Sequence, residues 1–122
     1  MEFKSINPYN NEQVDLFQAH TDAEVKEILR LAQNAFLSWK KIPIAERAER
    51  MNKAGELLRQ RTEEYARMIT LEMGKPISES RAEINKCAWV CDYYAENTSE
   101  FLADEIISSD AQKSFVRHDP LG

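Results

Sequence analysis

The chain has 122 residues, of which 43% are hydrophobic and 30% charged, the composition of an ordinary soluble domain. Its formal net charge of −5 argues against nucleic acid as the main partner, because binding to phosphates requires a clustered positive field. No apolar run approaches the roughly 20 residues that span a bilayer. The first residues, MEFKSINPYNNE, also lack the apolar core of a secretory signal, so we expect a cytoplasmic location, no membrane partner and reduced cysteines.

The first 20 residues predict a β-hairpin. Residues 3–6 and residues 13–19 form two short strands in this interpretation. The segment between them, Asn7 to Asn11, is rich in turn-forming residues, because proline fixes φ and asparagine tolerates the left-handed region.

The clearest element is a helix that begins after Thr21. Thr21 is a good N-cap, and Glu24 three residues later completes a capping box. The apolar residues that follow keep helical spacing without a miss: Val25, Ile28, Leu29, Ala32, Ala35, Phe36 and Trp39. Each large side chain contributes roughly 1.5–3 kcal/mol when buried, so this stripe requires a partner surface.

Two further helical segments are predicted between Pro43, which suits the first turn of a helix, and Gly74. The first covers about residues 44–61. Thr62 either caps a separate second helix or lies at a kink in one continuous helix, and both alternatives remain open. An acid followed four residues later by a base indicates ion pairs at Glu46–Arg50, Glu49–Lys53 and Glu63–Arg67.

Residues 71–76, LEMGKP, raise the possibility of a phosphate-binding loop. That motif requires a glycine where Ile69 stands and a hydroxyl residue where Pro76 stands, so it is excluded. Gly74 instead predicts the left-handed end of a helix, and Lys75 lies where a helix favours a cation. Glu72 is unfavourable there and is either solvated or paired elsewhere in the fold.

A long helix is predicted from residues 76–78 to about residue 97. Its apolar stripe is Ile84, Cys87, Ala88, Cys91, Tyr94 and Ala95. Two short strands follow at residues 105–108 and 114–118, with a turn at 109–113. A strand that leads into Asp-Pro-Leu-Gly favours a piece of a longer protein.

Cys87 and Cys91 are the strongest candidates for chemistry. A metal site would need two more ligands, and the only histidines, His20 and His118, are not placed near them. Their helical spacing of four residues also orients the thiols poorly for a disulfide. The flanking sequence offers no histidine as a base, so we expect two buried thiols that pack as small hydrophobes.

The remaining candidates favour structural roles. Trp39, Trp89, Tyr93 and Tyr94 are expected in a core or an interface, and the carboxylates alternate with bases along solvated helix faces. We therefore predict no catalytic, cofactor-binding or metal-binding residue within the chain.

Several stretches together resemble the aldehyde dehydrogenase family. They are INPYNNEQV at 6–14, A-F-x-x-W at 35–39, E-R at 46–47, L-L at 57–58, EMGKP at 72–76, DYYAE at 92–96 and DPLG at 119–122. These stretches follow the order that they have in the family, and together they cover nearly the whole chain. The wording of EMGKP and CDYYAE is most similar to the bacterial succinate-semialdehyde dehydrogenases within that family. Asn11 stands where the family has glycine, and its tolerance of the left-handed region preserves the turn.

The resemblance implies an intact enzyme that oxidises an aldehyde, succinate semialdehyde in that subfamily, to a carboxylic acid with NAD or NADP. A cysteine thiolate attacks the aldehyde, hydride leaves to the nicotinamide, and a glutamate activates water. In the family those groups lie beyond P-L-G, in the P-W-N, E-L-G-G and G-Q-x-C stretches. Neither Cys87 nor Cys91 has that context, so this chain alone is expected to be inactive.

The expected fold class is mostly α with short β-hairpins, the N-terminal helical part of an α/β aldehyde dehydrogenase-type fold. The resemblance implies a hairpin over residues 1–20, a helical region over 21–103 that packs on the dinucleotide-binding domain, and the start of an oligomerisation arm over 104–122. The implied partners are the remainder of the enzyme and further copies in a homo-oligomer. The alternative is a free-standing helical interaction module without catalysis, and a metal-dependent redox protein built on the two cysteines is a weaker third.

Overall fold

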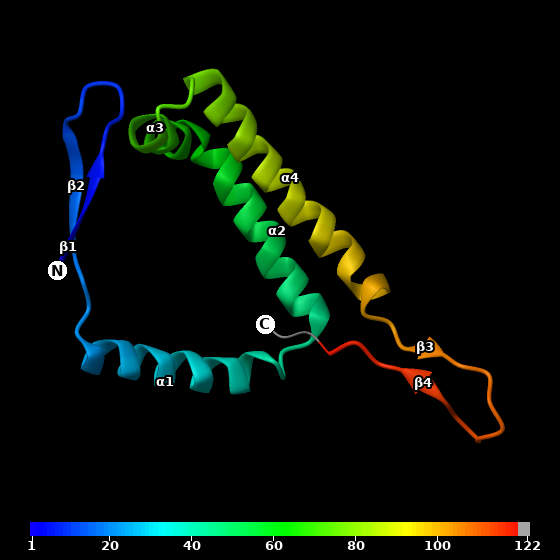
Figure 1. Cartoon of the computed structure of the whole chain (residues 1–122). Coiled ribbons are helices and arrows are strands. Elements are labelled where there is room, and N and C mark those ends of the chain that lie inside the picture. Colours follow the sequence, from blue (N-terminus) through cyan, green and yellow to red (C-terminus); the bar gives the residue numbers. More distant parts are fainter. Residues whose placement is uncertain (120–122) are drawn as a thin grey trace.

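The structure, a computed structural model, describes residues 1–119 and is mostly helical, with one short β-hairpin at each end (Figure 1). Its elements are β1 (Glu2–Ile6), β2 (Gln13–Gln18), α1 (Asp22–Trp39), α2 (Ile44–Gln60), α3 (Thr62–Met73), α4 (Ile77–Phe101), β3 (Glu105–Ile106) and β4 (Phe115–Val116). The predicted fold class and the predicted order of elements are confirmed.

β1 and β2 form the antiparallel hairpin predicted for the first 20 residues. Phe3 lies opposite Phe17, and the register shifts between Ser5 and Ile6. In the connecting turn, Asn11 has φ 60°, the left-handed geometry expected where the resembling family has glycine. The Asn11 N–H donates to the carbonyl of Asn7 at 2.8 Å, which closes the turn.

α1 has the predicted capping box. The Glu24 N–H donates to Thr21 Oγ1 at 3.3 Å, and the Thr21 N–H donates to Glu24 Oε2 at 2.7 Å. None of its 18 residues is buried, and its half-buried residues are Phe36 and Trp39, near its C-terminal end. The apolar stripe predicted on this helix is therefore present, but most of its side chains are exposed to solvent.

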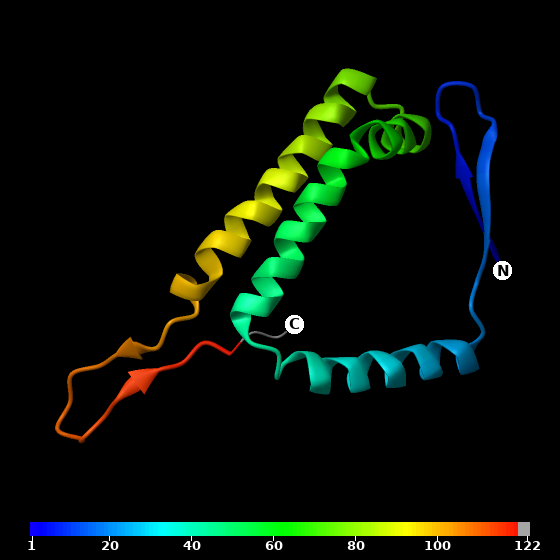
Figure 2. The ribbon, with the colours of Figure 1, turned by 180° about the vertical axis from the view of Figure 1, so that it is seen from behind.

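The packed centre of the molecule lies between α4 and the pair α2 and α3. α4 runs beside α2, and α3 lies beside the upper ends of these two helices (Figures 1 and 2). The buried apolar residues are mostly small: Ala66, Ile84, Ala88 and Ala95. Gly55 marks the close approach of α2 to α4, because a Cβ at this position would lie 2.8 Å from Asp92 Oδ1.

α3 ends as the sequence predicted. Gly74 has φ 69°, and its N–H donates to the carbonyl of Thr70 at 3.0 Å. The predicted cap at Thr62 is wrong, because its hydroxyl donates to the carbonyls of Leu58 and Arg59 in the preceding turn. Arg61, with φ −110°, separates α2 from α3, so the two helices are distinct.

Two of the three predicted ion pairs are wrong. Glu46 and Arg50 pair at 2.6 Å as expected. Lys53 instead pairs with Glu56 at 2.7 Å, three residues away on the same helix. Glu63 pairs at 2.7 Å with Arg81 of α4 in place of Arg67, because the crossing of α3 and α4 brings Arg81 closer.

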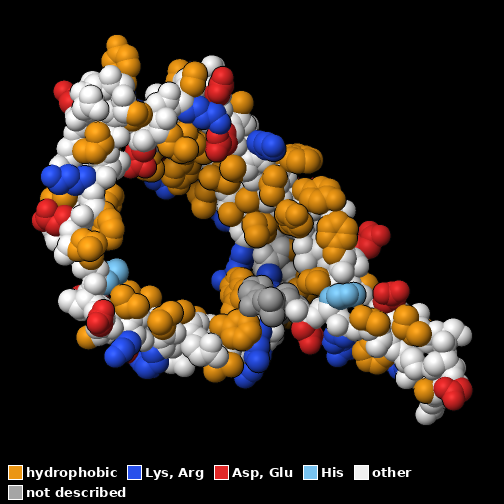
Figure 3. All heavy atoms as spheres, viewed as in Figure 1, with side chains coloured by type: hydrophobic (Ala, Val, Ile, Leu, Met, Phe, Trp, Pro, Cys, Tyr) orange, Lys and Arg blue, Asp and Glu red, His pale blue; other side chains and the backbone are white. Residues whose placement is uncertain are grey.

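The described part of the chain forms an open shape. Figure 3 shows an opening bordered by the N-terminal hairpin, α1 and the packed helices. The accessible surface is 9706 Å², whereas a compact monomer of this mass exposes roughly 6,700 Å². Large apolar side chains on every element add to this surface, so these residues bury only a small core.

Candidate functional site

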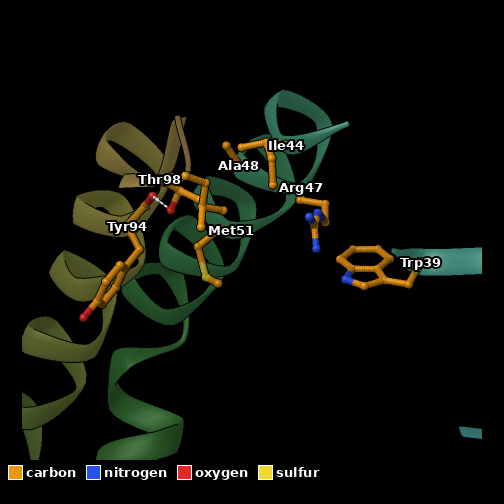
Figure 4. A pocket seen from close by; sticks show the side chains of 9 residues that line it. Trp39, Ile44, Arg47, Ala48, Met51, Tyr94 and Thr98 are labelled. Carbon is orange, nitrogen blue, oxygen red and sulfur yellow. Dashed lines mark hydrogen bonds between the residues drawn. The ribbon is translucent and has the colours of Figure 1, made fainter. Parts of the chain in front are cut away.

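An apolar groove of about 340 Å³ lies where α2 and α4 meet the end of α1 (Figure 4). It is lined by Trp39, Ile44, Arg47, Ala48, Met51, Tyr94, Ala95, Thr98 and Leu102. In Figure 4, the Arg47 guanidinium lies between the Trp39 indole and the two helices. Arg50 stacks on the same indole, with its guanidinium carbon 5.3 Å from the ring centroid.

The side chains of the groove favour binding of apolar groups over catalysis. Its one basic side chain is Arg47, no acidic side chain lines it, and the Thr98 hydroxyl already donates to the backbone carbonyl of Tyr94. The lining contains no cysteine, and no histidine or carboxylate that could activate either of its hydroxyls as a general base. This groove can therefore receive an apolar side chain, with the Trp39 ring as one wall.

A second, more open hollow of about 790 Å³ contains both cysteines. It is lined by Lys75, Glu79, Ala82, Glu83, Lys86, Cys87, Val90 and Cys91. Cys87 is exposed and Cys91 is half-buried near Gly55, so the prediction of two buried thiols is wrong for Cys87. Cys87 is exposed because the buried residues of α4, Ile84, Ala88 and Ala95, lie on a neighbouring side of the helix, about 60–100° round its axis from Cys87.

The charged side chains of the cysteine hollow are Lys75, Glu79, Glu83 and Lys86. The Lys75 ammonium donates to Glu83, and this hydrogen bond raises the pKa of Lys75. No histidine is among the lining residues. His20 lies 3.9 Å from Glu24 at the start of α1, and His118 lines a third hollow near the C-terminal hairpin.

That third hollow, of about 270 Å³, contains a paired acid and base. Arg117 donates to both carboxylate oxygens of Asp104, at 3.0 and 2.9 Å. These hydrogen bonds lower the pKa of the Asp104 carboxyl. The pair joins the segment before β3 to the segment after β4, which is a structural role.

Among residues 1–119 there is neither a metal-binding cluster of three or more ligands nor a helix that could span a membrane. This part of the chain contains no group of three or more histidine, cysteine, aspartate or glutamate side chains arranged to hold a metal ion. Among the helices described here, none is both long enough and apolar enough to cross a membrane.

Neither glycine of the described residues lies in the kind of loop that binds a dinucleotide. Gly55 is buried in a helix crossing, and Gly74 ends α3 with Pro8 against it. Neither opens a loop between a strand and a helix, which is where pyrophosphate binds. Neither glycine therefore supplies a pyrophosphate-binding turn.

Two contacts between distant elements were not predicted from the sequence. Arg59 of α2 donates to Asp92 of α4, and this hydrogen bond lowers the pKa of the Asp92 carboxyl. Ser5 of β1 donates to Glu72 Oε1 of α3 at 2.8 Å, which gives Glu72 the partner that its position required. Both contacts join distant segments, and no local spacing signals them.

The comparisons with known proteins all find aldehyde dehydrogenases. The profile of the Aldehyde dehydrogenase family matches residues 1–122. A probable NADP succinate-semialdehyde dehydrogenase of Synechocystis is 45% identical over 122 residues, which are 100% of this chain and 27% of the relative. An NAD(P) succinate-semialdehyde dehydrogenase of Escherichia coli is 40% identical over 118 residues, 97% of this chain and 26% of the relative.

Solved structures agree with the sequence comparisons. The succinic semialdehyde dehydrogenase of Streptococcus pyogenes, crystallised with NADP+, superposes with a TM-score of 0.86 at 30% identity. The match covers 93% of this chain and 25% of that one. The present chain thus spans about a quarter of the length of the relatives that it matches.

Proposed function

The chain belongs to the aldehyde dehydrogenase family, and on that premise we propose that it is the N-terminal quarter of an enzyme that oxidises succinate semialdehyde to succinate. The cofactor of that enzyme would be NADP or NAD, which accepts the hydride released from the aldehyde carbon. The observation that carries the proposal is the match of the entire chain to succinate-semialdehyde dehydrogenases of two bacteria.

The role proposed for this quarter is structural. The uncovered stripe of α1 and the apolar side chains of the N-terminal hairpin require a further layer of protein to bury them. We assign that layer to the dinucleotide-binding domain of the intact enzyme, which would pack on the helical region of residues 21–103. The β3–β4 hairpin would begin an oligomerisation arm over residues 104–122, of which residues 120–122 lie outside the described part.

An activity assay of two proteins tests the function. The 122-residue chain and the product of its complete reading frame are purified side by side and given succinate semialdehyde with NADP, and separately with NAD. Formation of reduced cofactor is followed at 340 nm. Activity only in the longer product is expected, since neither the apolar groove nor the cysteine hollow pairs a nucleophile with a histidine.

Two results would contradict the proposal. Turnover by the short chain would require a catalytic group within it, and the exposed thiol of Cys87 would be the first candidate. A reading frame that stops directly after Gly122 would favour a free-standing interaction module. As a control, Cys87→Ser in the longer product should leave activity unchanged, because this thiol has no catalytic role in the proposal.

A further inference from the structure

α4 carries two free cysteines on the wall of one open hollow. Cys87 is exposed, Cys91 is half-buried, and both line the hollow of about 790 Å³ described above. They are the only cysteines of the 122-residue chain, and neither has a role in the proposed oxidation. Two thiols that face the same space are able to act together on one bound group.

The separation of the two thiols suits a bridging atom better than a disulfide. Side chains four residues apart on a helix have Cβ atoms about 5–6 Å apart, whereas a disulfide needs about 3.8 Å. A metal ion between two thiolates, about 2.3 Å from each, holds the sulfurs about 4.6 Å apart in place of about 2.05 Å. The spacing that disfavours a direct S–S bond therefore fits one ion between the sulfurs.

The number of ligands narrows the kind of ion. A structural zinc ion takes four ligands, and residues 1–119 contain no group of three or more histidine, cysteine, aspartate or glutamate side chains able to hold a metal. Glu83, one helical turn before Cys87, is paired with Lys75. Thiolates are soft ligands that select Cu(I), and this ion is stable with two thiolates in line.

Basic side chains near the two thiols favour a negatively charged bridge. Two thiolates and one monovalent cation carry a net charge of −1. Lys86 directly precedes Cys87 and lines the same hollow. Arg59 of α2 is close enough to Cys91 for an electrostatic interaction. Glu79 also lines the hollow, but it lies eight residues before Cys87, about 12 Å along the helix axis.

We propose that Cys87 and Cys91 bind one Cu(I) ion in a two-coordinate bridge within α4. Two Cu–S bonds form, the two S–H protons pass to solvent, and copper stays Cu(I), so no electron is transferred. Both ligands belong to one helix, so the site requires neither a second copy nor another domain. It is also separate from the apolar faces of α1 and of the N-terminal hairpin, and it does not depend on the proposed function.

Anaerobic titration of the reduced 122-residue chain with Cu(I), in competition with the chromogenic chelator ferrozine, tests the proposal. One copper ion per chain is expected, and X-ray absorption at the copper edge should show two sulfur neighbours. The mass in sedimentation equilibrium should not change on binding, because the bridge lies within one chain. No copper uptake, nitrogen or oxygen neighbours, or a mass doubled by copper would each overturn the proposal.

Single substitutions test the two ligands. Cys87→Ser and Cys91→Ser should each weaken Cu(I) binding about 100-fold or more, because one bond of the bridge is lost and the second thiol no longer acts at high effective concentration. Circular dichroism in the far ultraviolet checks that each variant keeps its helices. If the half-buried position does not tolerate serine, the exposed Cys87 still decides the result. Unchanged affinity in Cys87→Ser would refute the bridge.

A matched control separates the spacing from the number of thiols. The double variant C87S/W89C keeps two cysteines, but it places the second thiol two residues from Cys91, about 160° round the helix. It should bind Cu(I) as weakly as Cys87→Ser, and binding as tight as in the natural chain would refute the geometry. A large excess of Zn²⁺ should not displace copper from the natural chain, and displacement would show that more than two ligands are present.

The longer reading-frame product tests the site in its wider context. Its further cysteines are common to the natural sequence and to the Cys87→Ser variant, so their contribution to copper binding cancels in the comparison. Cys87→Ser should lower the copper content of the longer product by one ion per chain. Equal copper contents of the two longer proteins would overturn the site.

Discussion

The backbone at Gly74 decides how the N-terminal hairpin meets the helices. Its φ of 69° reverses the chain between α3 and α4, and the ring of Pro8 from the hairpin turn lies directly against it. A Cβ at this position would lie 2.9 Å from Pro8 Cγ. One residue without a side chain thus serves both the helix end and a contact between distant segments.

Gly74→Ala should lower the free energy of unfolding by about 1–2 kcal/mol, because alanine is strained at positive φ and its Cβ would press on Pro8. Urea unfolding followed by circular dichroism measures the change. Gly74→Asn is the matched control and should lose less, since asparagine tolerates the left-handed region. Equal stability of the alanine variant and the natural chain would contradict the strain argument.

Between elements, the contact of α2 with α4 is joined at its edge by Arg59 and Asp92. The hydrogen bond from Arg59 lowers the pKa of Asp92 below its value in an unfolded chain. A lowered folded pKa means that the contribution to stability is complete above about pH 4, the unfolded value, and is lost as the pH falls through the folded value.

Asp92→Asn should therefore destabilise the chain at pH 7 and have a smaller effect at pH 2, because the contribution of the carboxylate is lost as the pH falls through the lowered pKa of Asp92. Free energies of unfolding in urea at the two pH values measure this. Glu96→Gln on the same helix removes an exposed carboxylate that has no ion pair among residues 1–119, and should show no such difference. The same loss in Asp92→Asn at both pH values would show that charge is not the cause.

Local sequence signals predicted the elements well and their mutual packing poorly. The capping box at Thr21 and the helix end at Gly74 depend on a few neighbouring residues, and both are present as predicted. The pairs Glu49–Lys53 and Glu63–Arg67 failed because spacing along one helix cannot include a competitor from another, such as Arg81. The exposure of Cys87 was missed for the same reason, since it depends on where α2 crosses α4.

At the scale of the whole molecule, burial is uneven, so equal substitutions should have unequal effects. Ile84 in α4 is 7% exposed, whereas Leu29 in α1 is 64% exposed. Ile84→Ala should cost about 2 kcal/mol or more of unfolding free energy, and Leu29→Ala less than about 0.5 kcal/mol. Thermal and urea unfolding of the two variants compare them, and a large loss for Leu29→Ala would show that α1 packs on the rest of this chain.

The longer reading-frame product extends this comparison. If a further domain covers α1 there, Leu29→Ala should become destabilising in that context while Ile84→Ala remains so. No added cost for Leu29→Ala in the longer product would contradict the proposed packing of residues 21–103.

The open shape also predicts binding of a hydrophobic dye. The short chain should increase the fluorescence of 8-anilinonaphthalene-1-sulfonate strongly, because large apolar side chains of every element are in contact with water. The longer product, at equal concentration, should give a much weaker signal. A weak signal from both proteins would show that the apolar faces are already covered in the short chain.

The isolation of α1 has a consequence for synthesis. This helix leaves the ribosome before α2, α3 and α4, yet those elements bury none of its residues when they form. Translation of the 83 residues that follow Trp39 takes on the order of ten seconds in bacteria. For that whole interval an amphipathic segment that ends in Phe36 and Trp39 is exposed on the nascent chain, which makes α1 the expected attachment point for a ribosome-bound chaperone.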